Sequence, residues 1–350
     1  MDLIKQNNET DKIAGISQLQ FICCCLVVFI HANPIASLGL ELNNLSNPLE
    51  ILMYHSIEII TKFAEISVAT FYLISGYLFY KAFDSYEDWI GKIRKRIKSV
   101  VVPYLLWSTI TWLFFVMLTH IPLIANHMNM GKVSLDIQSI FHDIFMSTFA
   151  PLWYLRYLFI YMIISIFLKK IVDYKNVALV FIVVIMSANL ITGYEYIGFW
   201  TWIPFFLIGA CFQVYGVHFK LKYIKLIFIL SIVTMIVSYV NNESVSGVYV
   251  YIYRVLISIS AFQYFRFYKK SSYKWRYDCS MVIYCGHIIL VNVLEKIFFL
   301  IFGKSILIAT VTYFSVTAIS VYIISFLSKH IYLQFPRCWS LISGNRQLKL

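Results

Sequence analysis

The sequence predicts an all-α, polytopic membrane protein with about ten transmembrane helices and both termini in the cytosol. Three observations lead to this prediction. Of the 350 residues, 60% are apolar and only 13% are charged, and the mean hydropathy is +0.76. A soluble domain of this composition would lack the polar residues needed to cover its surface. Apolar stretches of spanning length also recur along the chain, and basic residues fall between alternate stretches.

Ten apolar stretches are long enough to cross a hydrocarbon core as helices. With no linker or internal repeat among them, we expect one membrane domain over residues 1–350 and a basic cytosolic tail at 328–350. Residues 39–64 and 120–151 are expected to be long outer loops. The predicted spans lie at about 18–38, 65–83, 99–119, 152–168, 177–193, 199–216, 223–240, 247–265, 280–302 and 306–327.

The distribution of basic residues predicts the topology. With the N-terminus in the cytosol, 23 of the 29 Lys and Arg residues fall in inner segments, three in outer segments and three within spans. This is the asymmetry of a multi-pass protein of the cell membrane. The net charge of +12 therefore indicates orientation in the membrane and does not indicate nucleic-acid binding. The polar segment 1–12 lacks the basic and short apolar regions of a cleaved signal, so we expect the first span to be retained.

The cysteines and the loop histidines do not predict a metal site. The consecutive cysteines at 23–25 point to different faces of one helix and cannot share a metal ion. His120, His127 and His142 follow no usual ligand spacing and fit a solvated or interfacial loop. We therefore expect no bound metal.

His31 is the most informative residue, because it lies inside the apolar stretch of the first predicted span. An ionisable side chain in the hydrocarbon region marks a functional site by default, and histidine can move protons near neutral pH. Gln20 stands eleven residues earlier in the same span. At about 1.5 Å per residue the two are roughly 16 Å apart along a helix, which places His31 near the bilayer midplane.

Four further segments carry candidate functional residues, each with a structural alternative. Ser75-Gly76 interrupts the second span and either lines a pocket or lets helices pack closely. The basic residues 94–98, which precede Pro103, either bind phosphates or anchor the chain at the inner leaflet. Trp153, Tyr154 and Arg156 open the fourth span; the aromatic pair also suits an interfacial belt, whereas the arginine needs a partner.

The fourth segment is in the ninth span, where Tyr284 precedes His287 by three residues. His287 is the second histidine within a predicted span. Taken alone, it fits a hydrogen-bonded structural role better than a catalytic one.

In this order the segments resemble the acyltransferase-3 family of membrane acyltransferases, whose members O-acylate cell-surface polysaccharides, peptidoglycan, antibiotics and related acceptors. The family pattern has an arginine separated by ten residues from a histidine, a Ser-Gly motif, a basic inner loop that runs into proline, a Trp-Tyr-Leu element and a Tyr-x-x-His motif. The corresponding positions here are His31, Ser75-Gly76, 94–103, 153–155 and 284–287. The resemblance extends over nearly the whole chain.

The resemblance implies acetyl-CoA, or another acyl-CoA, as a cytosolic co-substrate and no resident cofactor. Gln20, Gly76, Arg94 and Arg96 would then bind the donor. His31 would act as the general base or as a covalent relay of the acyl group. Ser75 would orient the thioester or hold the developing oxyanion.

The resemblance also implies a glycan or lipid-linked sugar as the acceptor. Trp153, Tyr154 and Arg156 would suit the sugar, with Tyr284 and His287 in supporting positions.

Glutamine at position 20 departs from the family pattern, because it can donate hydrogen bonds but cannot neutralise a phosphate. Either the basic loop compensates or the activity is weakened or changed. Two other functions therefore stay open. One is a transporter or flippase of lipid-linked sugars or small anions that uses His31, Arg156, Arg254 and His287 along its path. The other is an inactive scaffold for polysaccharide assembly.

Overall fold

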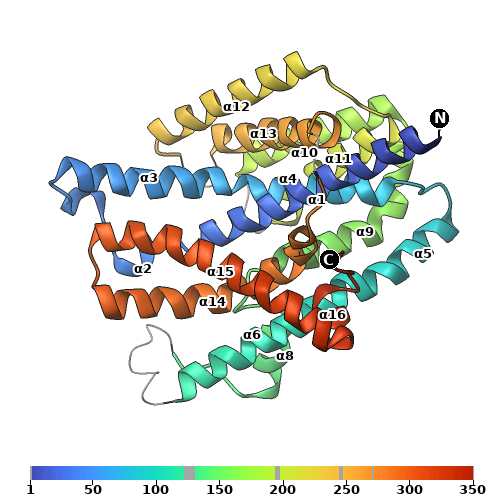
Figure 1. The fold of residues 1–350 in the computed structure, drawn as a ribbon. Helices are drawn as coiled ribbons and strands as arrows, with labels where there is room; N and C mark the ends of the chain where they lie inside the picture. The colour runs from blue at the N-terminus through green and yellow to red at the C-terminus, as the bar shows by residue number, and fades with distance from the viewer. Residues whose placement is uncertain (1, 122–130, 194–197, 244–246, 270–271, 350) are drawn as a thin grey trace.

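The chain folds as a bundle of helices (Figure 1), seen in a computed structural model that describes residues 2–121, 131–193, 198–243, 247–269 and 272–349. Within these ranges the structure contains no strand. The α-helices are α1 (Asp2–His31), α2 (Ile35–Leu38), α3 (Pro48–Ala64), α4 (Ile66–Tyr80), α5 (Tyr86–Arg96), α6 (Val102–His120), α8 (Ile137–Met146), α9 (Trp153–Val172), α10 (Lys175–Thr192), α11 (Phe199–Val214), α12 (Leu221–Val240), α13 (Val248–Phe267), α14 (Ser280–Phe302), α15 (Ile306–Gln334) and α16 (Pro336–Ser343). Short 3-10 segments lie at Leu42–Asn44 and Trp275–Cys279, and a π-helical segment, η2, at Ile97–Val101 joins α5 to α6.

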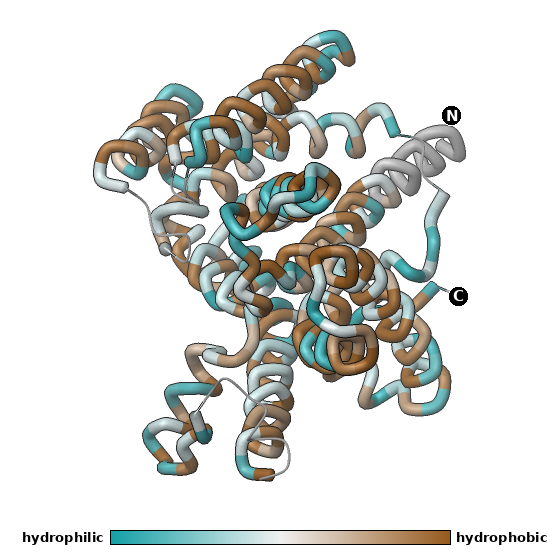
Figure 2. The backbone as a smooth tube through the Cα atoms, turned by 90° about the vertical axis from the view of Figure 1, so that its left-hand side faces the viewer, coloured by the Kyte–Doolittle hydropathy of each residue, from teal (hydrophilic) through white to brown (hydrophobic). Residues whose placement is uncertain are grey.

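The all-helical membrane fold is confirmed. Seven candidate spans among the described residues are long and apolar enough to cross a membrane, namely those in α1, α5–α6, α10, α12, α13, α14 and α15. Apolar residues run along most of the helices (Figure 2). The other predicted spans fold as α4, α9 and α11; α4 and α11 are only 15 and 16 residues long, and α9 carries three basic residues. The count of ten spans and the cytosolic placement of both termini stay predictions.

Helix α4 lies at the centre of the bundle, where it packs against α1, α9, α11 and α13. Glycines allow the backbones of α4 and α11 to approach closely. A Cβ on Gly76 would lie 1.9 Å from the carbonyl oxygen of Phe206, and one on Gly209 would lie 1.9 Å from that of Leu73. Gly76 is therefore explained by helix packing of the kind that small residues support in membranes.

The first of the two predicted outer loops needs a correction, because residues 48–64 form helix α3. This helix packs against α1 and α15 and leads into α4 with only Glu65 between them. Asn47 caps its N-terminus by accepting a hydrogen bond from the backbone N–H of Leu49. Polar residues such as Glu58 and Lys62 interrupt the hydropathy of this stretch, which explains why an apolar-run criterion misses the helix.

The second predicted outer loop, 120–151, contains helix α8. Asp136 caps the N-terminus of α8 by accepting the backbone N–H of Ser139 at 2.9 Å. Hydrogen bonds from Ser134 and Ser139 lower the pKa of Asp136 to about 2. His127 lies outside the described residues.

The predicted tail also needs a correction. Helix α15 continues to Gln334, and the following α16 packs against α6 and α14. The indole Nε1 of Trp107 donates a hydrogen bond of 3.0 Å to the carbonyl of Ile342, and Trp339 and Leu348 are buried. Residues 336–349 therefore form part of the folded bundle.

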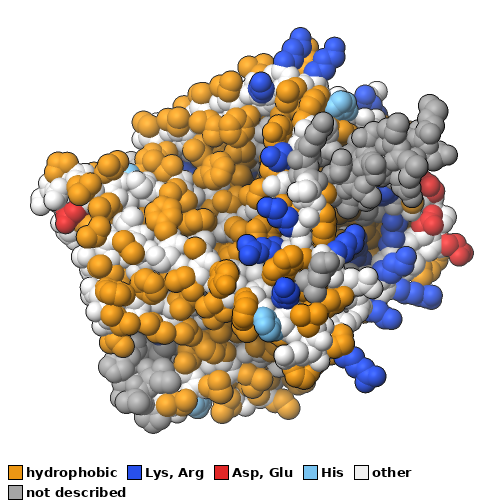
Figure 3. Space-filling view, in the orientation of Figure 1, with side chains coloured by type: hydrophobic (Ala, Val, Ile, Leu, Met, Phe, Trp, Pro, Cys, Tyr) orange, Lys and Arg blue, Asp and Glu red, His pale blue; other side chains and the backbone are white. Residues whose placement is uncertain are grey.

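Basic residues gather at one end of the molecule. Lys and Arg side chains are concentrated on the half of the visible face that contains the N-terminus and α5 (Figure 3). Apolar side chains cover most of the other half of this face. This polarity agrees with the charge asymmetry that the sequence predicts between the two ends of the bundle.

Candidate active site

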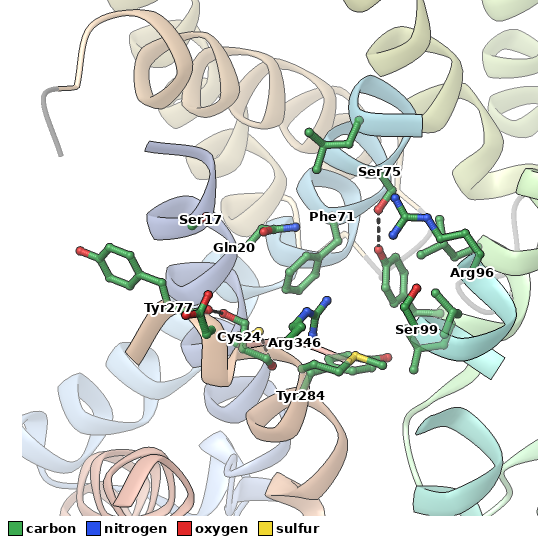
Figure 4. A pocket seen from close by; sticks show the side chains of 18 of the residues that line it. Ser17, Gln20, Cys24, Phe71, Ser75, Arg96, Ser99, Tyr277, Tyr284 and Arg346 are labelled. Carbon is green, nitrogen blue, oxygen red and sulfur yellow. Dashed lines mark hydrogen bonds between the residues drawn. The ribbon is translucent and has the colours of Figure 1, made fainter. Parts of the chain in front are cut away.

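A cavity of about 280 Å³ opens between α1, α4, α9, the start of α14 and the C-terminal segment. We call it the arginine cavity, because the side chains of Arg96 and Arg346 both line it. Figure 4 shows these two arginines on different sides of the space that Gln20 also faces. The predicted site residues that line the cavity are Gln20, Ser75, Arg96, Tyr154 and Tyr284.

The donor-binding residues predicted from the sequence are thus only partly brought together. Gln20 reaches the cavity from α1, and Arg96 reaches it from the last turn of α5. Arg94, two residues before Arg96, is exposed on the surface. Gly76 does not line the cavity and instead contacts the backbone of Phe206.

Ser75 and Tyr154 form a pair of hydroxyl groups on one wall of the cavity. Their oxygens lie 3.0 Å apart, and either hydroxyl can donate (Figure 4). The Tyr154 ring also lies 5.7 Å from the ring of Tyr284, measured between centroids. Tyr154 therefore belongs with the residues of α4 and α14 that line the arginine cavity, whereas the sequence placed it with the acceptor.

Trp153 and Arg156 do not line this cavity. The Trp153 ring packs 6.0 Å from the ring of Trp202. The Nη1 of Arg156 lies 2.7 Å from the sulfur of Met146 and 3.4 Å from its carbonyl oxygen, in α8. The partner that the sequence required for Arg156 is thus supplied by the end of α8.

Tyr284 and His287 occupy successive turns of α14. The Tyr284 hydroxyl donates a 2.6 Å hydrogen bond to the carbonyl of Pro151. The Nδ1 of His287 lies 2.7 Å from the carbonyl oxygen of Tyr284 and 3.2 Å from that of Ile283. Because carbonyl oxygens only accept, Nδ1 must carry the proton, and Nε2 keeps its lone pair. That Nε2 is buried and has no hydrogen-bond partner among the described residues.

His31 is the last residue of α1, and its ring lies beside that of His287. The two ring centroids are 5.1 Å apart, at an interplanar angle of 42°. His31 is half-buried as a residue, and it does not line the arginine cavity. The Tyr284 ring does line it and lies 6.3 Å from the ring of His287. Tyr284 therefore lies nearest the cavity, His287 lies next to Tyr284, and His31 lies beyond His287.

A second polar pocket, of about 270 Å³, lies where α3 meets the end of α12. We call it the glutamate pocket, because Glu58, Glu65 and Glu243 line it together with Lys62. Thr61 also lines it, and this hydroxyl accepts a 3.1 Å hydrogen bond from the amide of Asn33. Since Asn33 follows His31 by two residues, the end of α1 lies between the two polar cavities.

The structure accounts for Arg254 without a transport role. Its Nη2 forms an ion pair with Glu65, and the arginine side chain is fully buried. A buried charge of this kind is tolerated when it is paired. Among the described residues, no group of three or more His, Cys, Asp or Glu side chains is arranged to hold a metal ion.

Arg346 is the site residue that the sequence did not identify. The sequence predicts a basic cytosolic tail here, although this tail contains Trp339 and Leu348, which are both buried in the structure. Large apolar residues spaced through a basic tail are the signal that could have indicated a packed segment.

Comparison with known proteins adds one finding to this geometry. No curated protein and no solved structure is detectably similar to the chain. A family profile described as "Acyltransferase domain" matches residues 13–328. This range begins in α1, ends in α15 and contains His31, Ser75, Arg96, Tyr154 and His287. The chain therefore belongs to the acyltransferase-3 family of membrane acyltransferases.

Proposed function

We propose that this membrane acyltransferase moves an acyl group, acetyl in the simplest case, from a cytosolic acyl-CoA to a hydroxyl of a cell-surface or lipid-linked glycan. We further propose that it works as a multi-pass protein of the cell membrane. The observation that carries the proposal is the arginine cavity, whose inner wall leads through Tyr284 to the paired rings of His287 and His31.

The donor side of the proposal rests on charge. Coenzyme A carries several phosphates, and guanidinium groups bind phosphates with two parallel hydrogen bonds. Arg96 and Arg346 line the same cavity, and Arg96 belongs to α5. This helix lies at the end of the molecule where the basic residues gather (Figure 3). The positive-inside rule assigns such an end to the cytosol, where acyl-CoA is available.

In the proposed reaction, His31 removes the proton of the acceptor hydroxyl while its oxygen attacks the thioester carbonyl carbon. The carbon–sulfur bond then breaks, and coenzyme A leaves as the thiol with the proton that His31 had taken. The hydroxyls of Ser75 and Tyr154 line the arginine cavity on the donor side of Tyr284, where they can donate hydrogen bonds that orient the arriving acyl-CoA. Because Tyr284 separates the cavity from His287, the thioester must pass the Tyr284 ring to reach His31.

His287 supports His31 in this proposal. Its Nδ1 is fixed by the carbonyl of Tyr284, so the ring presents an unprotonated Nε2 within the protein. A second proton acceptor beside the base helps to hold the proton between attack and departure of the thiol. In the covalent alternative, His31 itself would carry the acyl group before the acceptor takes it.

The acceptor side rests on the glutamate pocket. Carboxylates accept hydrogen bonds from sugar hydroxyls, and they repel anionic donors. The Glu58 carboxylate lines this pocket, and Thr61 links the pocket to Asn33 beside His31. An acceptor bound there would approach His31 from the side opposite the arginine cavity.

The test is mass analysis of surface and lipid-linked glycans from cells that carry the intact gene, a deletion, His31→Ala or His330→Ala. His330 is the matched control, because it is exposed on α15 and its Nδ1 is hydrogen-bonded to the carbonyl oxygen of Phe326. We expect an acyl-sized mass increment in the intact and His330→Ala cells and its loss in the other two.

Two outcomes would contradict the proposal. Glycans of identical mass in all four strains would exclude this acceptor class. Glycans of normal mass that accumulate on the inner leaflet of the deletion strain would indicate a transporter.

A further inference from the structure

The C-terminal segment after α16 is held in one position by contacts on both sides of residue 346. The indole Nε1 of Trp339 donates a 2.5 Å hydrogen bond to the carbonyl oxygen of Arg346. The backbone N–H of Arg346 donates a 3.2 Å hydrogen bond to the hydroxyl of Ser343. Gly344 has a φ of +71° and packs against the backbone of Ser99, where a Cβ would lie 2.5 Å from the carbonyl oxygen. These contacts fix the backbone of the segment in place.

The guanidinium of Arg346 faces the arginine cavity and forms no ion pair among the described residues (Figure 4). Its Nη1 is buried and has no hydrogen-bond partner among the described residues. The nearby carboxylate of Asp278, which also lines the cavity, accepts hydrogen bonds from the Tyr273 hydroxyl and from the backbone N–H of Lys349. Burial lowers the pKa of Arg346, but a guanidinium stays protonated in proteins.

Arg96 brings a second positive charge to the same cavity. It lies close enough to Arg346 for repulsion between the two guanidinium groups. Neither arginine forms an ion pair within the part of the chain that the structure describes. Two partly buried guanidinium groups that form no ion pair repel each other, and an anion that enters between them would offset this repulsion.

The size of the cavity limits what this anion can be. About 280 Å³ is near the lower end of the ~300–1,000 Å³ range of small-molecule pockets. The space suits one phosphate-bearing part of a donor and is small for a whole nucleotide cofactor. Gln20 faces it with an amide, which can hydrogen-bond a phosphate but cannot neutralise it.

We propose that the C-terminal segment forms one wall of the donor site and that Arg346, together with Arg96, binds a phosphate of the acyl-CoA. Arg346 thereby supplies, from the other end of the chain, the positive charge that the family resemblance expects at position 20. Arg346 lies beyond residues 13–328, which the family profile matches, so this role belongs to a part of the chain outside the matched domain. The inference rests on the proposed donor, and the experiment below separates the two.

The experiment measures binding of coenzyme A to the purified full-length protein in detergent micelles, without acyl transfer. The variants are Arg346→Gln, Arg346→Lys and, as the matched control, Arg337→Gln, which removes an exposed arginine from the preceding helix α16. The second probe is S-acetylpantetheine, which has the thioester arm but no phosphate. Thermal unfolding of each variant establishes that it is folded.

We expect Arg346→Gln to weaken coenzyme A binding about ten- to hundredfold, as for the loss of a charge-assisted hydrogen bond. Arg346→Lys should weaken it less, because the charge remains. Binding of S-acetylpantetheine should be the same in all variants. In the Arg346→Gln background, Gln20→Arg should restore part of the affinity for coenzyme A.

The inference is overturned if Arg346→Gln binds coenzyme A as well as Arg337→Gln does, or if it loses affinity for both probes equally. The proposed function fails separately. If coenzyme A binds through Arg346 but labelled acetyl-CoA leaves no acyl group on any glycan fraction, the phosphate site stands and the acceptor class is wrong. If acyl transfer occurs and Arg346→Gln leaves the KM for acetyl-CoA unchanged, only the role of Arg346 is wrong.

Discussion

The two polar cavities on either side of the His31 segment have opposite charge. The arginine cavity has two guanidinium groups, and the carboxylate of Asp278 at its edge is already hydrogen-bonded. The glutamate pocket has three carboxylates and Lys62, whose amine is hydrogen-bonded to the carbonyls of Ser238 and Glu243. An anionic donor and a neutral, hydroxyl-rich acceptor would therefore be sorted to different sides before either reaches the histidines.

The two pockets also differ in how their charges are used by the fold. In the glutamate pocket, Glu65 pairs with buried Arg254, and Glu243 accepts the backbone N–H groups of Tyr249 and Val250 at the start of α13. Glu58 has no such structural partner among the described residues. In the arginine cavity, neither Arg96 nor Arg346 forms an ion pair within the described chain. The charges that the fold leaves unused are the ones available to substrates.

The largest expected effect is at the histidine pair between the pockets. In the purified protein, His287→Ala should lower kcat about 10²-fold or more, because it removes the proton acceptor beside His31. The KM for acyl-CoA should change less than about twofold, since His287 does not line the arginine cavity. Steady-state kinetics of His287→Ala and His330→Ala make the comparison. A raised KM with an unchanged kcat would show that His287 serves only to maintain the cavity.

The next effect concerns stability at the glutamate pocket. Glu65→Gln leaves the guanidinium of Arg254 charged and buried, which should lower the free energy of unfolding by about 3–5 kcal/mol. Glu41→Gln, at an exposed carboxylate, should change it by less than ~0.5 kcal/mol. Denaturation of the purified protein in micelles measures both. Equal stability of the two variants would mean that the Arg254–Glu65 pair is not a structural element, and a transport role for Arg254 would need to be reconsidered.

Hydropathy was sufficient to predict the fold class, but it did not predict where the helices end. The first span was predicted to run to residue 38, but α1 ends at His31. The cause is local: Pro34 disfavours a helical residue before it, and the side chain of Asn33 accepts the backbone N–H of Ile35 to start α2. His31 is thus the last residue of the helix and is half-buried. The Asn-Pro dipeptide was the available signal.

Site residues that belong to short motifs could be predicted from the sequence. Contacts that depend on how distant helices pack could not. Ser75 and Tyr154 were singled out from sequence, but their mutual hydrogen bond depends on how α4 and α9 pack. Gly76 was open to two interpretations, and the carbonyl of Phe206 favours close packing. Arg346 was missed because its contact with the cavity joins the two ends of the chain, and no local pattern encodes such a contact.

A smaller effect should separate two neighbouring arginines of α5. Arg96→Gln is expected to raise the KM for acyl-CoA about ten- to hundredfold, because its guanidinium lines the arginine cavity. Arg94→Gln should raise it less than about twofold, because Arg94 is exposed and contributes only a screened surface charge. The test is to measure the KM of each variant for acyl-CoA at low and at high salt. Similar increases for both variants, abolished by salt, would replace the phosphate site with general attraction to a basic surface.

The smallest expected effect tests the acceptor side. Glu58→Gln keeps the size of the side chain but weakens its capacity to accept hydrogen bonds from sugar hydroxyls. We expect the KM for the glycan acceptor to rise about two- to tenfold, as for one hydrogen bond, with no change in the KM for acyl-CoA. Glu41→Gln serves again as the control at an exposed carboxylate. If Glu58→Gln instead raises the KM for acyl-CoA, the pockets do not sort the substrates by charge, because a carboxylate pocket that binds the anionic donor contradicts the electrostatic contrast between the two cavities.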